Sequence, residues 1–158
     1  MIEVAFLALL LLWLGFNWLA PFTLLIRAEP MSAGRVASDL AIHARAAGAR
    51  LYTARLEHPG GFSVLAWPLR LVIFDRDSLA LTPAWAWRFL IAHELGHCAL
   101  GHLQARWLLT VTGLCLLPAG RRWLAEMEHE ADAYAERLTG LSAESFHQPK
   151  ESTHEDVA

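Results

Sequence analysis

The chain has 158 residues, enough for one domain with a modest core but not for two independent ones. Its formal net charge of −3 excludes a basic surface of the kind that binds nucleic acid. A hydrophobic content of 55% is high and indicates membrane attachment. The two cysteines, Cys98 and Cys115, match neither a disulfide framework nor a Cys-x-x-Cys zinc site, so each is interpreted as a free thiol.

An apolar run from Ile2 to Ile26 is the first feature in chain order. It is long enough to cross a bilayer with some tilt, so residues 1–28 are predicted to form a single transmembrane helix in contact with membrane lipid. A signal peptide is the weaker alternative because the start lacks positive charge, and a buried core helix is the other. Arginines follow the run and none precedes it, which predicts a bacterial inner-membrane protein with its catalytic domain in the cytoplasm.

The next segment predicts one helix and then a short sheet. A helix is expected from Ser32 to about Ala47, followed by strands at Leu51–Leu56, Phe62–Trp67 and Leu69–Phe74. The last of these is predicted to be an edge strand, which can hold an extended peptide by backbone pairing. The fold class is therefore α+β, with residues 29–140 as the folded domain.

The motif His93-Glu94-x-x-His97 lies on a helix expected to start at Thr82-Pro83 and to run to about Gly101. On a helix the two histidines are one turn apart and can share a zinc ion, while Glu94 can act as general base on the metal-bound water. His102 lies nine residues after His93, on the opposite side of this helix, so it is excluded as a third ligand.

A short apolar run, Trp107–Leu117, follows and is predicted to be an interfacial or packed helix. The helix expected at Trp123–Leu138 then offers several glutamates, and its phase selects among them. Glu128 falls on the apolar stripe, where an unpaired carboxylate is costly, so it is the candidate ligand. Glu126 and Glu130 fall on the opposite side and are interpreted as a solvated face.

Asp132 is one helical turn from Glu128 and is placed to accept a hydrogen bond from a ligating histidine. Two histidines and one carboxylate leave the fourth zinc position for water, which is the arrangement of a catalytic site.

Two motifs, His-Glu-Leu-Gly-His-x-x-Leu-Gly-His and Glu-x-Glu-Ala-Asp-x-x-Ala, resemble those of the HtpX and CaaX prenyl protease family of membrane zinc endopeptidases. The resemblance covers about residues 62–139. It implies a zincin-like domain with ligands His93, His97 and Glu128, with Glu94 as the base and Asp132 as an orienting residue. Family members usually carry a transmembrane hairpin between the two motifs, where this chain has only the short apolar run.

The expected function is therefore a membrane-anchored zinc endopeptidase acting on a peptide or protein substrate. One alternative is a membrane-bound regulatory protein with a structural or inactive zinc site. Another is a repressor-directed peptidase of the ImmA/IrrE type, which shares both motifs but lacks an N-terminal span. Residues 141–158 are polar and are predicted to be a disordered tail.

Overall fold

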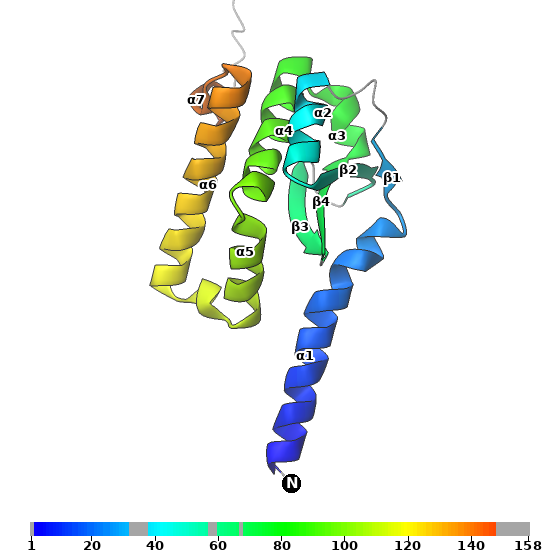
Figure 1. Cartoon of the computed structure of the whole chain (residues 1–158), viewed down its shortest axis with the longest axis vertical. Coiled ribbons are helices and arrows are strands. Elements are labelled where there is room, and N and C mark those ends of the chain that lie inside the picture. Colours follow the sequence, from blue (N-terminus) through cyan, green and yellow to red (C-terminus); the bar gives the residue numbers. More distant parts are fainter. Residues whose placement is uncertain (1, 32–37, 57–59, 67, 148–158) are drawn as a thin grey trace, which may run out of the picture.

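The computed structural model of the chain describes residues 2–31, 38–56, 60–66 and 68–147. Within these residues the chain forms helices and a four-stranded mixed sheet, so the α+β class is confirmed (Figure 1). In order the elements are α1 (Ile2–Leu25), β1 (Glu29–Pro30), α2 (Ser38–Ala46), β2 (Ala49–Ala54), β3 (Gly61–Ala66), β4 (Leu69–Asp75), α3 (Arg76–Leu81), α4 (Ala84–Ala99), α5 (His102–Val111), the 3-10 turn η2 (Leu114–Leu116), α6 (Pro118–Thr139) and α7 (Ala143–His147). The start of the helix expected from Ser32 lies outside the described residues, and α2 forms its second part.

The sheet has the order β1-β2-β4-β3. Strand β4 pairs in parallel with β2 and antiparallel with β3, while β1 pairs antiparallel with β2. The prediction that Leu69–Phe74 is an edge strand is therefore wrong, because both of its edges are already paired. The edge position was inferred from the place of this strand next to the histidine-motif helix in the sequence. That order does not show that β3 pairs with the second edge of β4.

Both faces of β4 are covered, which explains its unbroken apolar sequence. Val72 and Phe74 point to one face and belong to a core shared with α2 and α4. Leu71 and Ile73 point to the other face, and all four side chains are fully buried. The sheet is thus the middle layer of the molecule, with α4 held firmly against one side of it.

The apolar N-terminal run forms α1, but the prediction of a transmembrane helix over residues 1–28 is wrong. Among the described parts of the chain, no helix combines the length and apolarity needed to cross a membrane, and the expected membrane location is corrected with it. Phe22 and Leu25, near the end of α1, pack on the sheet face of Leu71 and Ile73. These two apolar residues of the run therefore have partners within the protein.

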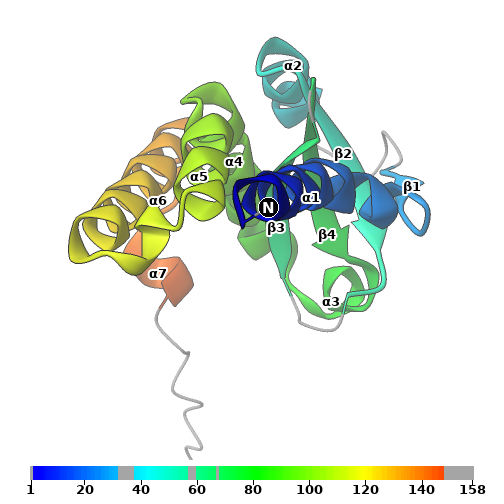
Figure 2. The same cartoon turned by 90° about the horizontal axis from the view of Figure 1, so that it is seen from below.

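The N-terminal turns of α1 extend beyond the sheet towards the end of α5 (Figures 1 and 2). The indole Nε1–H of Trp13 donates a hydrogen bond to the carbonyl oxygen of Val111, at 3.2 Å. Several apolar side chains of these turns are exposed, among them Phe6, Leu9 and Leu12.

Asp75 is the last residue of β4 and lies directly before α3. The carboxylate of Asp75 accepts hydrogen bonds from the amide of Ser78 at 2.7 Å and from the amide of Leu56 at 3.0 Å. Asp75 is therefore the N-cap of α3. Helix α4 follows after Pro83 and ends at Ala99, two residues before the predicted end.

Helix α4 is interrupted before α5 at Gly101, whose φ of 77° lies in the left-handed region that glycine adopts without strain, and α5 continues in the same general direction as α4 (Figure 1). The short apolar run expected at Trp107–Leu117 is divided between α5 and η2, and of its leucines Leu109 is buried while Leu108, Leu114, Leu116 and Leu117 are exposed. Helices α5 and α6 then lie side by side with η2 at their turn (Figures 1 and 2). Gly120 allows this turn to be tight, since a Cβ there would overlap the Leu114 carbonyl.

Part of the expected tail is structured. Residues 143–147 form α7, and the ring of Phe146 stacks on Phe89 of α4 with centroids 5.0 Å apart. The remainder of the predicted tail, residues 148–158, lies outside the described residues.

Candidate metal centre

Helix α4 brings the two motif histidines together in the interior. His93 and His97 are one turn apart, and their Nε2 atoms lie 3.2 Å from each other. The side chain of His97 is only 1% exposed and that of His93 14%. Two imidazole nitrogens that converge in a buried place need a shared proton or cation between them.

Helix α6 supplies the third member. Glu128 Oε2 lies 3.3 Å from His93 Nε2 and 3.4 Å from His97 Nε2. His93, His97 and Glu128 therefore form a group that could hold a metal ion. The side chain of Glu128 is 48% exposed, so this group opens to solvent on one side.

The close packing of α6 on α4 depends on a glycine between the histidines. A Cβ on Gly96 would lie 3.2 Å from the Cα of Ala131 and 3.3 Å from its carbonyl oxygen. Ala131 is fully buried, as are Met127 and Ala135 on the same side of α6. Small residues at the crossing let the backbones approach, so that Glu128, at the border of this buried stripe, reaches the histidines.

Asp132 holds the first histidine. Its Oδ1 lies 2.8 Å from His93 Nδ1, on the ring edge opposite Nε2. Burial lowers the pKa of His93, but the hydrogen bond with Glu128 and the charges of Glu94 and Asp132 outweigh that effect and raise it. Asp132 therefore does what its helical position suggested.

His102 and Glu130 form a second set of contacts, which sequence reasoning missed. His102 Nδ1 lies 3.0 Å from His97 Nδ1, and His102 Nε2 lies 2.9 Å from Glu130 Oε2. His102 is not a member of the metal-binding group, as expected, but the reason given for that was wrong. Helical phase placed it away from the site, whereas the break in the helix at Gly101 turns His102 against His97.

Arg106 is a further residue that the sequence gave no reason to select. It lies one turn after His102 on α5, and its Nη1 donates to Glu128 Oε1 at 3.2 Å. Hydrogen bonds from His93 and then His97, together with the Arg106 charge, hold the pKa of Glu128 well below its usual range. Glu128 is therefore a carboxylate at neutral pH, with Oε2 towards the histidines and Oε1 towards the arginine.

Glu94 is the buried acid of the motif, with 6% of its surface exposed. Its negative charge helps to raise the pKa of the neighbouring His93. Glu94 does not belong to the group formed by His93, His97 and Glu128.

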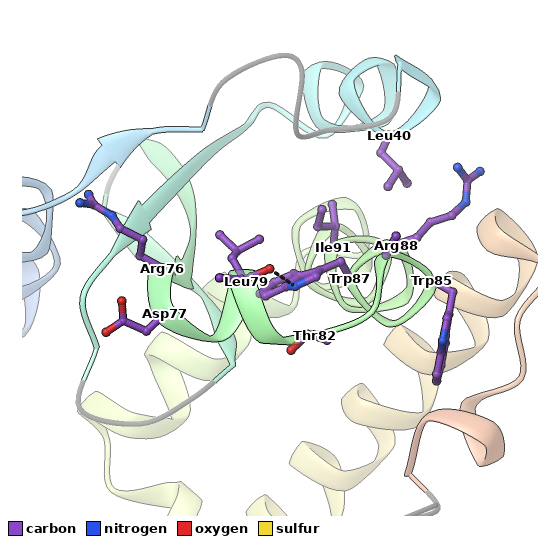
Figure 3. A pocket seen from close by; sticks show the side chains of 11 residues that line it. Leu40, Arg76, Asp77, Leu79, Thr82, Trp85, Trp87, Arg88 and Ile91 are labelled. Atoms are coloured by element: carbon purple, nitrogen blue, oxygen red, sulfur yellow. Dashed lines mark hydrogen bonds between the residues drawn. The ribbon is translucent and has the colours of Figure 1, made fainter.

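An open pocket of about 820 Å³ lies elsewhere, between α2, α3 and the N-terminal half of α4 (Figure 3). Trp87 is fixed in it by a hydrogen bond from its indole nitrogen to the carbonyl oxygen of Leu79, and Arg88 forms an ion pair with Asp39. None of the three metal-binding side chains lines it. Because convergent ionisable groups define a reactive site better than volume does, the histidine cluster is the stronger candidate.

Comparison of the chain with protein-family models, with curated proteins and with solved structures gives no match.

Proposed function

We propose that this protein is a zinc-dependent peptidase whose ligands are His93, His97 and Glu128. The observation that carries the proposal is the spacing of the three donor atoms, 3.2, 3.3 and 3.4 Å. Ligands about 2.0–2.1 Å from a tetrahedral zinc ion are separated by about 3.3 Å, so the donors already lie on one face of such a tetrahedron.

The composition of the group favours a catalytic site over a structural one. Structural zinc sites usually have four protein ligands, commonly including cysteines, whereas catalytic sites have three and keep one position open. Among the described residues, no fourth histidine, cysteine or acidic side chain joins the group. The partial exposure of Glu128 supports an open side through which a substrate could reach the ion.

Glu94 and Asp132 then have distinct roles at the proposed zinc site. A zinc ion bound here would lower the pKa of a water and polarise a substrate carbonyl. Glu94 would accept the proton of the attacking water and pass it to the leaving amine. Asp132 holds the His93 ring with its Nε2 towards the ligand group.

The substrate class is peptide or protein. The resemblance of both motifs to the HtpX and CaaX prenyl protease family supports a peptide bond as the target. An extended substrate that pairs with the sheet would need an outer strand, and beside β4 that strand is β3.

The test compares the full-length protein with two variants, Glu94→Gln and Glu128→Ala. Zinc content is measured by elemental analysis, and cleavage of a peptide library by mass spectrometry. We expect about one zinc per wild-type chain and cleavage that a chelator abolishes and added zinc restores. Glu94→Gln should keep its zinc and lose at least about 100-fold in cleavage rate, since it removes the proton acceptor alone.

Glu128→Ala should lose both zinc and activity. A wild-type chain that binds no zinc would contradict the metal site. Zinc binding with cleavage that is equal in the wild type and Glu94→Gln would contradict the proposed mechanism, and no cleavage of any peptide by the zinc-loaded wild type would contradict peptidase activity.

A further inference from the structure

His102 is buried between two ionisable groups from different helices. Its Nδ1 faces His97 Nδ1 at 3.0 Å, and its Nε2 faces Glu130 Oε2 at 2.9 Å. The side chain of His102 is 6% exposed, while that of Glu130 is 65% exposed. The contacts thus run from the ligand group, through α5, to a carboxylate on the surface of α6.

The proposed role of His97 as a zinc ligand determines which ring nitrogens of His97 and His102 carry a proton. To offer a lone pair on Nε2, a neutral His97 must carry its proton on Nδ1. That N–H can donate only to a lone pair, so His102 Nδ1 must be the unprotonated nitrogen. The proton of His102 is then on Nε2, where it donates to the Glu130 carboxylate.

The two ligand histidines are therefore oriented by different means. His93 Nδ1–H has a carboxylate, Asp132, as its direct acceptor at 2.8 Å. His97 has an imidazole as its acceptor, and the carboxylate stands one residue further away. In both cases a carboxylate of α6 fixes which nitrogen of an α4 histidine is free.

We propose that His102 and Glu130 are positioning residues of the metal centre, which hold His97 in the tautomer and ring orientation that presents Nε2. The inference rests on the metal site proposed above. Partners of this kind typically change metal affinity by about 10–100-fold when they are removed.

The test measures zinc affinity of the full-length protein by competition with a chromophoric chelator. His102→Leu removes both hydrogen bonds and should weaken zinc binding by about 10–100-fold. His102→Gln has an amide that can accept from His97 and donate to Glu130, so it should recover most of the affinity. Glu130→Ala should weaken binding less, by several-fold, because water can reach this exposed position.

Glu126→Ala is the matched control, since Glu126 is an exposed glutamate on the same helix. It should leave zinc affinity unchanged. The double variant His102→Leu/Glu130→Ala should bind zinc no more weakly than His102→Leu alone, because Glu130 acts only through His102. Losses that multiply in the double variant would overturn the relay.

A spectroscopic measurement separates positioning from a general structural effect. In ¹⁵N-histidine NMR of the zinc-loaded protein, the Nδ1 proton of His97 should be visible and slow to exchange with solvent. It should exchange faster in Glu130→Ala, a substitution at the surface that leaves the core intact, and unchanged exchange there would overturn the inference. If the wild type binds zinc and His102→Leu, folded by circular dichroism, binds it equally well, the inference fails while the proposed function stands. If the wild type binds no zinc, the proposed function fails as well.

Discussion

Replacement of Gly96 by alanine tests how closely the metal centre depends on the approach of α6 to α4. The new Cβ would lie 3.2 Å from the Cα of Ala131 and 3.2 Å from the Cβ of Tyr134. Ordinary carbon–carbon contacts are about 3.5–4.0 Å, so the helices must separate by about 0.3 Å or more. The nearest atoms belong to backbone and to a Cβ, which cannot move aside as the end of a flexible side chain could.

The expected stability change is the sum of two opposing contributions. Alanine is about 1 kcal/mol better than glycine within a helix, whereas overpacking a tight contact costs about 1–3 kcal/mol. Gly96→Ala should therefore range from neutral to about 2 kcal/mol less stable. Gly15→Ala is the matched control, because Gly15 lies inside α1 with no atom within 4 Å of its added Cβ, and it should be stabilising by up to about 1 kcal/mol.

The assay is urea unfolding of both variants, followed by zinc competition. Because metal sites tolerate ligand displacements of only about 0.2 Å, Gly96→Ala should also weaken zinc binding, whereas Gly15→Ala should not. If Gly96→Ala proved as stabilising as Gly15→Ala and bound zinc with unchanged affinity, the argument from close packing would be refuted.

Three further outcomes are expected. Arg106→Gln should weaken zinc binding by about fivefold at most in the chelator competition, because its ion pair with Glu128 is partly exposed and such pairs contribute about 1 kcal/mol or less. Hydrogen bonds from Ser78 and Leu56 hold the pKa of Asp75 at about 2, below its usual 3.8. Its ionised form therefore stabilises the fold above about pH 4, and that contribution is lost as the pH falls towards 2. Asp75→Asn should accordingly melt at a lower temperature than the wild type at pH 7, with the difference closing near pH 2 in a thermal melt. Burial, followed by the charge of Glu94, raises the pKa of Cys98 to about 12. Iodoacetamide should therefore label Cys115 and leave the buried Cys98 unmodified in the native protein, as measured by peptide mass mapping.

Helical phase was a reliable guide where one helix runs without interruption. Glu128 was selected from several glutamates because α6 is regular from Pro118 to Thr139, so a stripe read from the sequence keeps its direction. The same reasoning failed for His102 because α4 ends at Ala99 and Gly101, in the left-handed region, interrupts the helical phase. Periodicity says where a side chain points only as long as the helix continues, and the glycine before His102 was the available signal that it does not.

The contacts of Glu130 and Arg106 could not be read from the sequence for a different reason. Both side chains are substantially exposed, and each finds its partner on another helix. Composition and phase describe one helix at a time, so they assign such residues to a solvated surface. The end of α1 was ambiguous for another reason, because hydropathy does not reveal that Phe22 and Leu25 pack against the sheet.

In the hairpin of α5, η2 and α6, the residues that contact the histidine cluster and the turn that joins the two helices lie at opposite ends of α5. His102 and Arg106 act from the first two turns of α5, whereas the chain turns over at η2, at the opposite end of that helix (Figure 1). Gly113, just before η2, has a φ of 72°, which favours glycine, whereas the side chain of Leu116 at the turn is exposed. A fluorescent label attached at Leu116 would therefore be separated from the groups that surround the histidines by most of the length of α5.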